Sequence, residues 1–212
     1  NGLYVSLSSK ELFGVATDGH RLAKSGVETD IILEETVSAI IPRKGVIEID
    51  KQLGEESQIL SVGVSKNHLQ ISAKDTNAIS KLIDGKFPDY EKVIPLDATK
   101  KILVECKSFK EALIRVSILS NDRFRGVRLN FADNEIKVSA NNPEKEEASD
   151  DIKATYSGEP IEVGFNVNYL IDVLNAIKTK NVQVLLKDNN SSALLMPEND
   201  NSSSYVVMPL RL

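Results

Sequence analysis

Apolar and polar residues alternate at the start of the chain, where they predict extended strands. The first two runs, Leu3–Leu7 and Glu11–Thr17, are separated by a short polar turn and are typical of a β-hairpin. Thr17–His20, Thr-Asp-Gly-His, predicts a turn, after which Arg21–Lys24 resumes the extended pattern. The same reasoning predicts further short strands, one that ends at Ile41 and others over 59–64, 68–73, 78–83, 102–106, 127–131, 135–140, 154–156, 161–165, 182–186, 192–196 and 204–208.

Three stretches change to the spacing of an amphipathic helix, with apolar residues three and four positions apart. The first spans Pro42–Leu53, with proline at the first helical position. The second begins at Ser108, which can cap it, and ends at Ser120, and the third runs over Val167–Ile177. The predicted core stripe of the first helix is Val46, Ile49 and Leu53, and that of the second is Phe109, Ala112, Leu113, Val116 and Leu119.

The pattern repeats along the chain at a constant shift of 124 positions, which pairs apolar residues with apolar residues over several segments. A constant register is hard to obtain by chance, so the sequence predicts a tandem repeat of one structural unit. The matched residues are Leu3, Val5 and Leu7 with Val127, Leu129 and Phe131; Leu12 and Ala16 with Ile136 and Ala140; Val46, Ile47, Glu48, Ile49 and Leu53 with Leu170, Ile171, Asp172, Val173 and Ile177; Leu69 and Ile71 with Ala193 and Leu195; and Ser80, Leu82 and Ile83 with Ser204, Val206 and Val207.

The repeat and one irregular stretch define the predicted domains. Gly85–Pro95 carries no periodicity and contains two prolines, so we interpret it as a linker between domains 1–92 and 93–212. The second domain has a strand and a helix, over about 102–120, before its first hairpin. We expect the corresponding elements of the first domain to precede Asn1 in a longer chain. The predicted fold class is α+β, with helices on one face of antiparallel sheets.

The C-terminal stretch Ser204–Leu212 stays apolar to its last residue. Tyr205, Val206 and Val207 favour a strand, and Pro209 ends it because proline has no N–H to donate. We expect an irregular, exposed apolar end after this strand. Such an end either packs into a groove or contributes to a binding site.

Composition excludes several kinds of chemistry. The chain of 212 residues has a net charge of −5, a single cysteine and no run of about 18 apolar residues, which favours a cytoplasmic protein without disulfides or membrane spans. Cys106 is expected to be a buried, inert thiol in a strand. With two histidines, no phosphate-binding glycine loop and no catalytic set, we expect no metal, no cofactor and no enzyme activity. The acidic run 144–151 is interpreted as a solvated loop.

Two features leave their interpretation open. Basic residues lie on or just after the predicted helices, where they either stabilise helix C-termini or present positive charge to a phosphate backbone. They are Arg43, Lys44, Lys51, Arg115, Arg123, Arg125, Lys178 and Lys180. Apolar residues outside regular elements either pack the linker and tail onto the body or line a groove for a peptide. These are Pro88, Val93, Met208, Pro209 and Leu210, and Thr17, Gly19 and Leu22 at a turn would line the same groove.

Several strings resemble the bacterial DNA polymerase III beta subunit family, the sliding clamps, over nearly the whole chain. They are T-D-G-H-R-L at 17–22, P-R-K-G-V-I-E at 42–48, K-L-I-D-G-K-F-P-D-Y at 81–90, F-R-G-V-R-L at 124–129, G-F-N-V at 164–167 and Y-V-V-M-P-L-R-L at 205–212. The resemblance implies a processivity factor of DNA replication. Two protomers of three domains each would close a ring around duplex DNA and tether polymerases, clamp loader and repair proteins to it.

The resemblance also implies roles for particular residues. Positive charge on helices lining the hole would attract DNA without reading its sequence. The implied peptide-binding residues are Thr17, Gly19, His20, Arg21, Leu22, Pro88, Lys92, Val93, Phe124, Asn166, Tyr169, Asn190, Ser192, Val206, Val207, Met208, Pro209, Leu210, Arg211 and Leu212. Lys92 stands where the family commonly has arginine, and Asn190 stands where it commonly has an apolar residue.

The second helix carries a possible contact surface between protomers. Ile114 and Ile118 lie off its predicted core stripe, and large apolar residues there suggest a contact. In the resembling family this region, with Ile118 and Leu119, meets the other protomer, whereas we expect the present chain to be a monomer. Two other classes compete with the clamp: a repeat-built peptide-binding scaffold without a DNA role, and an enzyme, which the missing catalytic set opposes.

Overall fold

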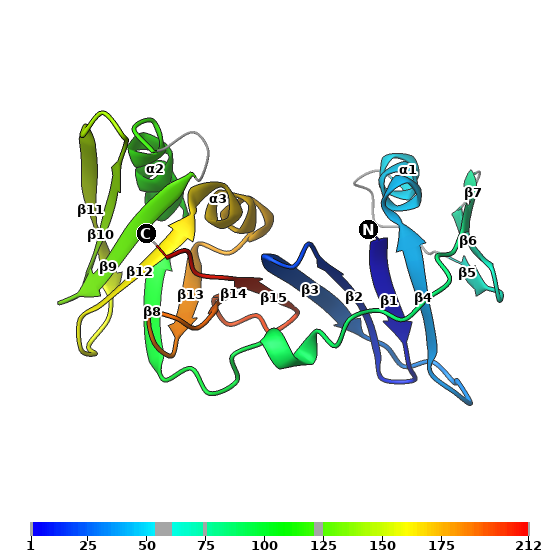
Figure 1. Cartoon of the computed structure of the whole chain (residues 1–212). Coiled ribbons are helices and arrows are strands. Elements are labelled where there is room, and N and C mark those ends of the chain that lie inside the picture. The colour runs from blue at the N-terminus through cyan, green and yellow to red at the C-terminus, as the bar shows by residue number, and fades with distance from the viewer. Residues whose placement is uncertain (1, 54–60, 74–75, 121–124, 212) are drawn as a thin grey trace. The chain divides into compact units, whose positions relative to one another are not determined.

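The computed structural model describes residues 2–53, 61–73, 76–120 and 125–211 (Figure 1). The chain divides into two compact units. Unit 1 comprises 1–18 and 23–89, and unit 2 comprises Gly19–Leu22 and Tyr90–Leu212. The short segment Gly19–Leu22 therefore belongs to unit 2, although unit 1 flanks it on both sides in the sequence.

Unit 1 contains one helix and two antiparallel arrays of strands in its described part. Its strands are arranged in the orders β3-β2-β1-β4 and β5-β6-β7. The elements are β1 (Gly2–Leu7), β2 (Glu11–Thr17), β3 (Arg21–Glu28, whose first two residues fall in unit 2), β4 (Val37–Pro42), α1 (Arg43–Leu53), β5 (Ser61–Val64), β6 (His68–Ala73) and β7 (Thr76–Lys81).

Unit 2 places two helices against a continuous antiparallel array with the strand order β12-β9-β10-β11-β8-β13-β14-β15. The α+β fold class predicted from the sequence is confirmed. The elements are the short 3₁₀ helix η1 (Glu91–Val93), β8 (Lys100–Glu105), α2 (Cys106–Ser117), β9 (Gly126–Ala132), β10 (Glu135–Asn141), β11 (Glu147–Thr155), β12 (Ile161–Asn166), α3 (Val167–Ala176), β13 (Asn181–Leu186), β14 (Ala193–Pro197) and β15 (Ser203–Val207).

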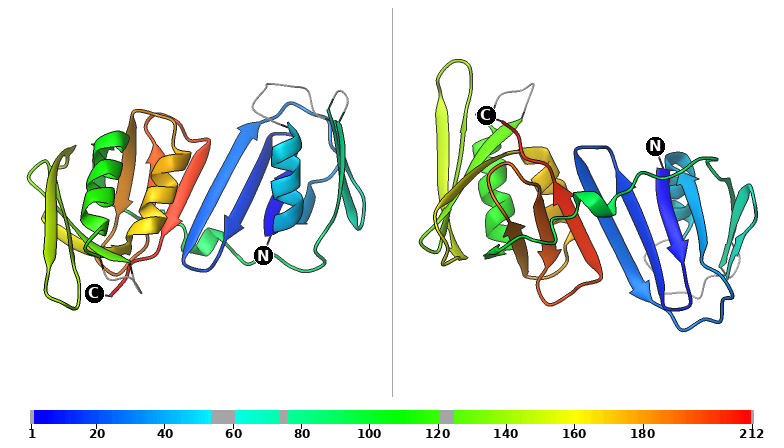
Figure 2. Two further views of the ribbon diagram at one scale, coloured as in Figure 1. Left: turned by 90° about the horizontal axis from the view of Figure 1, so that it is seen from above. Right: turned by 60° about the horizontal axis from the view of Figure 1, so that its bottom comes forward.

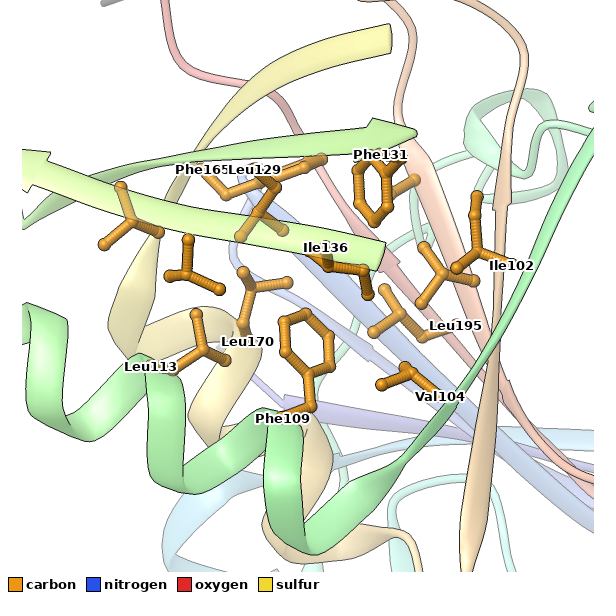
Figure 3. Packing of buried hydrophobic residues seen from close by; sticks show 14 of the residues in the cluster. Ile102, Val104, Phe109, Leu113, Leu129, Phe131, Ile136, Phe165, Leu170 and Leu195 are labelled. Atoms are coloured by element: carbon orange, nitrogen blue, oxygen red, sulfur yellow. The ribbon is translucent and has the colours of Figure 1, made fainter. Parts of the chain in front are cut away.

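The core of unit 2 lies between its helices and its strands. Helices α2 and α3 run side by side and contact each other (Figure 2). Phe109 and Leu113 of α2 extend toward Leu129, Ile136 and the other strand residues drawn in Figure 3, and all four are essentially inaccessible to solvent. Because each fully buried large apolar side chain contributes about 1.5–3 kcal/mol, this layer holds the helices to the sheet.

The predicted repeat is confirmed in the pairing of the first strands of each unit. Tyr4 faces Val15 across β1 and β2, and a shift of 124 gives Arg128 facing Ser139 across β9 and β10. β1 and β4 are related to β9 and β12 by the same shift, since β4 covers Val37–Pro42 and β12 covers Ile161–Asn166. Equal spacing and equal register show that one strand pattern was used twice.

The constant shift fails at the last hairpin. A shift of 124 carries β7, Thr76–Lys81, onto 200–205, whereas β15 covers Ser203–Val207. Leu69 pairs with Ser80, whereas its equivalent Ala193 pairs with Val207. The predicted equivalence of Ser80, Leu82 and Ile83 with Ser204, Val206 and Val207 is therefore wrong. The loop after β14 contains a polar turn in which the Asp200 carboxylate accepts a hydrogen bond from the Ser202 N–H at 2.8 Å. Loops absorb such length differences without disturbing the strands they connect.

Helix α2 begins earlier than its sequence suggested. Cys106 is its first residue rather than the end of a strand, and its N–H donates to the Lys180 carbonyl at 2.9 Å. Ser108 is not the cap, because Glu105 holds that position and the Ser108 hydroxyl donates to the Glu105 carboxylate. The helix also ends at Ser117, before the predicted Ser120.

Two further expectations are wrong. Pro42 is the last residue of β4 and not the first of α1, which begins at Arg43. The acidic run is not simply a loop, since Glu147 pairs with Asn141 and residues from Glu147 onward form β11. Ile152 of β11 is buried, whereas Glu147 and Asp151 lie on the opposite, exposed side, so the charges had hidden a half-buried strand.

The two helices that the repeat relates differ in burial. α3 buries Val167, Leu170, Val173 and Leu174, whereas α1 has no buried residue among those described. In unit 2 the neighbour of α3 is α2, and unit 1 shows no second helix in its described part. The apolar side of α1 is therefore covered less completely than that of α3.

Candidate functional site

The segment Gly19–Leu22 joins unit 2 through its backbone and its buried leucine. Gly19 has φ +87°, a conformation that glycine adopts without steric cost. The carbonyl of His20 accepts a hydrogen bond from the Met208 N–H at 3.0 Å, and Leu22 is 4% exposed. A backbone hydrogen bond thus connects the turn to the C-terminal tail.

Arg21 makes an ion pair and a cation–π contact with residues of unit 2. Its Nη1 lies 2.5 Å from the Asp172 Oδ2, and its guanidinium carbon lies 4.5 Å from the centre of the Tyr169 ring. The His20 ring is roughly parallel to that of Tyr169, with 6.5 Å between the ring centres. We call His20, Arg21, Tyr169, Asp172 and Met208 the Tyr169 cluster. It combines an aromatic face, a balanced ion pair and an apolar side chain, a composition suited to amphipathic ligands.

The C-terminal tail leaves the sheet but stays attached to the body. Val206 and Val207 of β15 are buried, whereas Met208, Pro209 and Leu210 are half-buried. The N–H of Leu210 donates to the Gly164 carbonyl at 2.8 Å. The tail is irregular, as expected, but it is half-buried rather than exposed, because backbone hydrogen bonds hold it against unit 2.

Helix α3 places Tyr169 in its first turn. The Asn166 side chain caps the helix by accepting a hydrogen bond from the Asn168 N–H at 3.0 Å. Tyr169 is half-buried and Asp172 follows it by three positions, so both side chains lie on the same side of the helix. The cap fixes where the helix starts and thereby where these two side chains project.

The other residues implied by the family resemblance are placed as follows. Ser192 is half-buried just before β14, and Asn190 is exposed in a polar turn. Lys92 and Val93 form part of η1. Thr17 and Pro88 belong to unit 1, and Phe124 and Leu212 fall outside the described residues. The structure thus brings together the Gly19–Leu22 segment, Tyr169 and Met208, and the remaining assignments stay predictions.

Asp172 was missed by the sequence reasoning. It lies three residues after Tyr169, on the same side of a predicted helix, and its charge is opposite to that of Arg21. Those two signals were available. The contact joins residues 151 positions apart, and no local sequence pattern links two residues at that separation.

The basic residues near the helices differ in their surroundings. Arg115 of α2 is engaged by acids, with its Nη2 2.6 Å from Asp150 and its Nη1 4.0 Å from Glu111. Lys51 pairs with Glu48 at 3.3 Å. The remaining described members are exposed or half-exposed: Arg43, Lys44, Arg125, Lys178 and Lys180. Arg123 falls outside the described residues. Arg115 is therefore a weaker candidate for holding an external anion than the sequence implied.

Ile114 and Ile118 are exposed, as their positions off the core stripe predicted. The exposed fractions are 44% and 77%, whereas the neighbouring Leu113 is 0% exposed. Leu119 lies beyond the end of α2 and is half-buried. A contact surface between protomers at these residues stays a prediction.

The rest of the unit shows little reactive chemistry. Cys106 is half-buried, and burial raises the pKa of its thiol, which disfavours the reactive thiolate. Among the described residues no group of three or more histidine, cysteine or acidic side chains could hold a metal ion. No helix in the described part is long and apolar enough to cross a membrane.

The fold and the Tyr169 cluster define a class of protein: tandem copies of one α+β unit, with a mixed aromatic, ionic and apolar surface on the second copy. Comparison with known families is consistent with that class and extends it. The central domain of the DNA polymerase III beta subunit matches residues 1–89, and the C-terminal domain of the same subunit matches residues 91–211. The chain belongs to the DNA polymerase III beta subunit family.

Curated relatives agree with this assignment. The beta sliding clamp of Pseudomonas putida is 42% identical over 212 residues, and that of Escherichia coli K12 is 44% identical over the same length. All of the chain is covered in each case, but the chain spans only 58% of the length of these relatives. A solved DNA polymerase sliding clamp from Pseudomonas aeruginosa is 40% identical with a TM-score of 0.97, and it is covered over 59% of its length.

Proposed function

We propose that the chain is part of a processivity factor of DNA replication, a ring-shaped, non-catalytic clamp that tethers polymerase and repair proteins to duplex DNA in the cytoplasm. In this proposal the two units are the middle and C-terminal clamp domains, and the chain passes from one to the other within the predicted linker Gly85–Pro95. The proposal is supported by membership of the DNA polymerase III beta subunit family and by the Tyr169 cluster.

The observation that carries the docking function is the junction of turn, helix and tail in unit 2. Met208 bonds to His20, and Arg21 lies on Tyr169, so three separate segments meet at one place. The half-buried Tyr169 ring offers apolar area, and the polar groups around it can orient a ligand. We assign to this place a short peptide with an aromatic or leucine anchor. A solved sliding clamp from Pseudomonas aeruginosa carries griselimycin, which agrees with a ligand site on a relative.

The proposed DNA role rests on exposed positive charge beside the helices. Lys178 and Lys180 follow α3, and Arg43 and Lys44 open α1. Scattered cations attract the phosphate backbone without reading bases, which suits a ring that slides. Because the whole chain has a net charge of −5, its acidic side chains would then face away from DNA. A peptide-binding scaffold without a DNA role would lack any salt-dependent affinity for duplex DNA.

Isothermal titration calorimetry on the 212-residue chain tests the docking function. The ligand is a blocked pentapeptide with a central Leu-Phe pair, and the variant lacks residues 208–212. We expect the parent chain to bind the peptide and the truncated chain to lose binding, because the apolar tail has been removed. Circular dichroism establishes that the truncated chain is folded.

A matched control removes apolar surface elsewhere. Ile118→Ser replaces an isoleucine that is 77% exposed at the end of α2, and it should leave peptide affinity unchanged. Unchanged affinity in the truncated chain, or an equal loss in Ile118→Ser, would place the peptide site elsewhere.

A further inference from the structure

The loop between β3 and β4 exposes a group of large apolar side chains on unit 1. Ile32 is fully exposed to solvent, and Ile31 beside it is exposed as well. Val27, near the end of β3, is 60% exposed. Single exposed apolar side chains are common on protein surfaces, whereas several within one short segment indicate a contact surface.

Carboxylates accompany these apolar residues along the segment. Residues 27–36 include four acidic side chains and no lysine or arginine. The four, all exposed, are Glu28, Asp30, Glu34 and Glu35. We call these four residues, together with Val27, Ile31 and Ile32, the Ile32 surface. It combines apolar area with negative charge, whereas the exposed Ile114 of α2 is followed by the basic Arg115.

Both ends of the loop are held by the first hairpin of unit 1. The Thr29 N–H donates to the Lys10 carbonyl at 2.9 Å, and the Thr29 hydroxyl donates to the Ser8 carbonyl at 3.1 Å. Val37, the first residue of β4, pairs with Leu7 of β1. The loop therefore lies beside the β1–β2 turn (Figure 1). Anchored ends lower the conformational entropy that a loop loses on binding, which favours a role in recognition.

We propose that the Ile32 surface is a second docking site, which binds a basic amphipathic segment of a partner protein. Lysine or arginine side chains of that segment would pair with the four carboxylates, and its large apolar side chains would cover Ile32. The inference goes beyond the peptide site at the Tyr169 cluster and does not depend on it, because every residue of the Ile32 surface belongs to unit 1.

The charge of the Ile32 surface distinguishes this partner from other occupants of an apolar surface. Two copies of the chain that met through this surface would bring their carboxylates together, and like charges at short range repel. Nucleic acid and anionic lipid would be repelled for the same reason. A basic amphipathic segment, in contrast, is attracted by the carboxylates and removes the exposed apolar area from water.

Calorimetry on the 212-residue chain tests this docking site with the probe acetyl-Lys-Leu-Leu-Lys-Lys-Leu-Leu-Lys-amide. We expect the parent chain to bind the probe and not to bind a matched peptide with glutamate in place of each lysine. Ile32→Ser should weaken binding about five-fold or more, as truncation of a central apolar contact does in interfaces. Glu34→Gln combined with Glu35→Gln should weaken binding about two- to five-fold, and this loss should shrink at about 0.5 M salt.

Matched control variants change the same chemistry elsewhere. Ile79→Ser removes an isoleucine that is 69% exposed on β7, and it should leave the affinity for the basic probe unchanged. Glu135→Gln combined with Glu159→Gln removes two exposed carboxylates of unit 2 and should also leave it unchanged. Deletion of residues 208–212 should have no effect, because that tail belongs to the other proposed site. Circular dichroism establishes that each variant is folded.

Several results overturn the inference. They are a parent chain that does not bind the basic probe, equal affinity in Ile32→Ser and the parent, and an equal loss in either control variant. A loss on deletion of residues 208–212 would place the probe at the Tyr169 cluster instead. Light scattering that shows a dimer in the parent and a monomer in Ile32→Ser would assign the surface to a second copy of the chain. A parent chain that binds the blocked pentapeptide but not the basic probe contradicts this inference alone and leaves the proposed function standing.

Discussion

Leu113 and Ile114 are consecutive residues of α2 with opposite environments. Leu113 is 0% exposed in the core of unit 2, and Ile114 is 44% exposed. Leu113→Ala removes three carbons, which at about 0.8 kcal/mol for each buried CH₂ amounts to roughly 2.4 kcal/mol of lost transfer free energy. The cavity left behind raises the expected loss to about 2.7–5.0 kcal/mol. Ile114→Ala should change stability by no more than about 0.5 kcal/mol, as at other surface positions.

Guanidinium unfolding followed by far-ultraviolet circular dichroism measures both variants. Because the chain has two units, hydrogen exchange of the α2 and α3 amides on the same samples assigns the affected transition to unit 2. Equal losses in the two variants, or a loss below about 1 kcal/mol for Leu113→Ala, would refute the assigned orientation of α2.

Three further outcomes are expected. Lys178→Glu combined with Lys180→Glu should weaken binding to duplex DNA at low salt and flatten the salt dependence of that binding. The control, Lys137→Glu with Lys153→Glu, changes exposed strand positions by the same charge and should leave binding unchanged. Fluorescence anisotropy measures both, and equal losses would assign the effect to net charge rather than to the proposed DNA face. Light scattering at micromolar concentration should give the mass of a monomer, 23.3 kDa. The exposed patch of Ile114 and Ile118 is too small to hold two copies of the chain together, and a stable dimer would contradict this reasoning. The hydrogen bond and ion pair from Lys187 lower the pKa of Asp97, so their contribution to stability is present above the usual aspartate pKa of 3.8 and is lost as the pH falls through the lowered pKa. Asp97→Asn should therefore destabilise the chain slightly at neutral pH but not at about pH 1–2. Equal effects of the substitution at both pH values would contradict this linkage.

The strand pairing of the first hairpins could be predicted because two independent signals agree. Alternation assigned the strands, and the shift of 124 required Tyr4–Val15 and Arg128–Ser139 to be equivalent pairs. The shift failed at β15 since loop length is not constrained by the pattern of a core. Periodicity therefore predicts elements and register well, but it does not predict insertions between them.

Local sequence patterns gave wrong predictions at the start of α2 and at β11, where contacts with segments distant in sequence determine the structure. Ser108 is a good cap by type, yet α2 starts at Cys106, whose N–H bonds to the distant Lys180 carbonyl. β11 was concealed because Glu147 and Asp151 lie on its exposed side, while Ile152 is its one large apolar residue on the side that faces the core. Tertiary pairing overrode propensity in both places.

The candidate site was predictable in part. The turn at Gly19–Leu22 and the tail could be connected through the family resemblance, and the His20–Met208 hydrogen bond joins them. The partner of Arg21 could not be found, because Asp172 lies 151 positions away and carries no motif of its own. Helical spacing placed Asp172 beside Tyr169, but only the fold places Arg21 over both.

Chemical-shift mapping tests the central claim most directly. The ¹⁵N-labelled chain is titrated with the blocked pentapeptide, and amide shifts are followed residue by residue. We predict the largest changes in the Gly19–Leu22 segment, around Tyr169 and in the tail from Val206 to Arg211, with little change along β10 and β11. Changes concentrated on the exposed side of α2, or no changes at all, would contradict a peptide-docking site at the Tyr169 cluster.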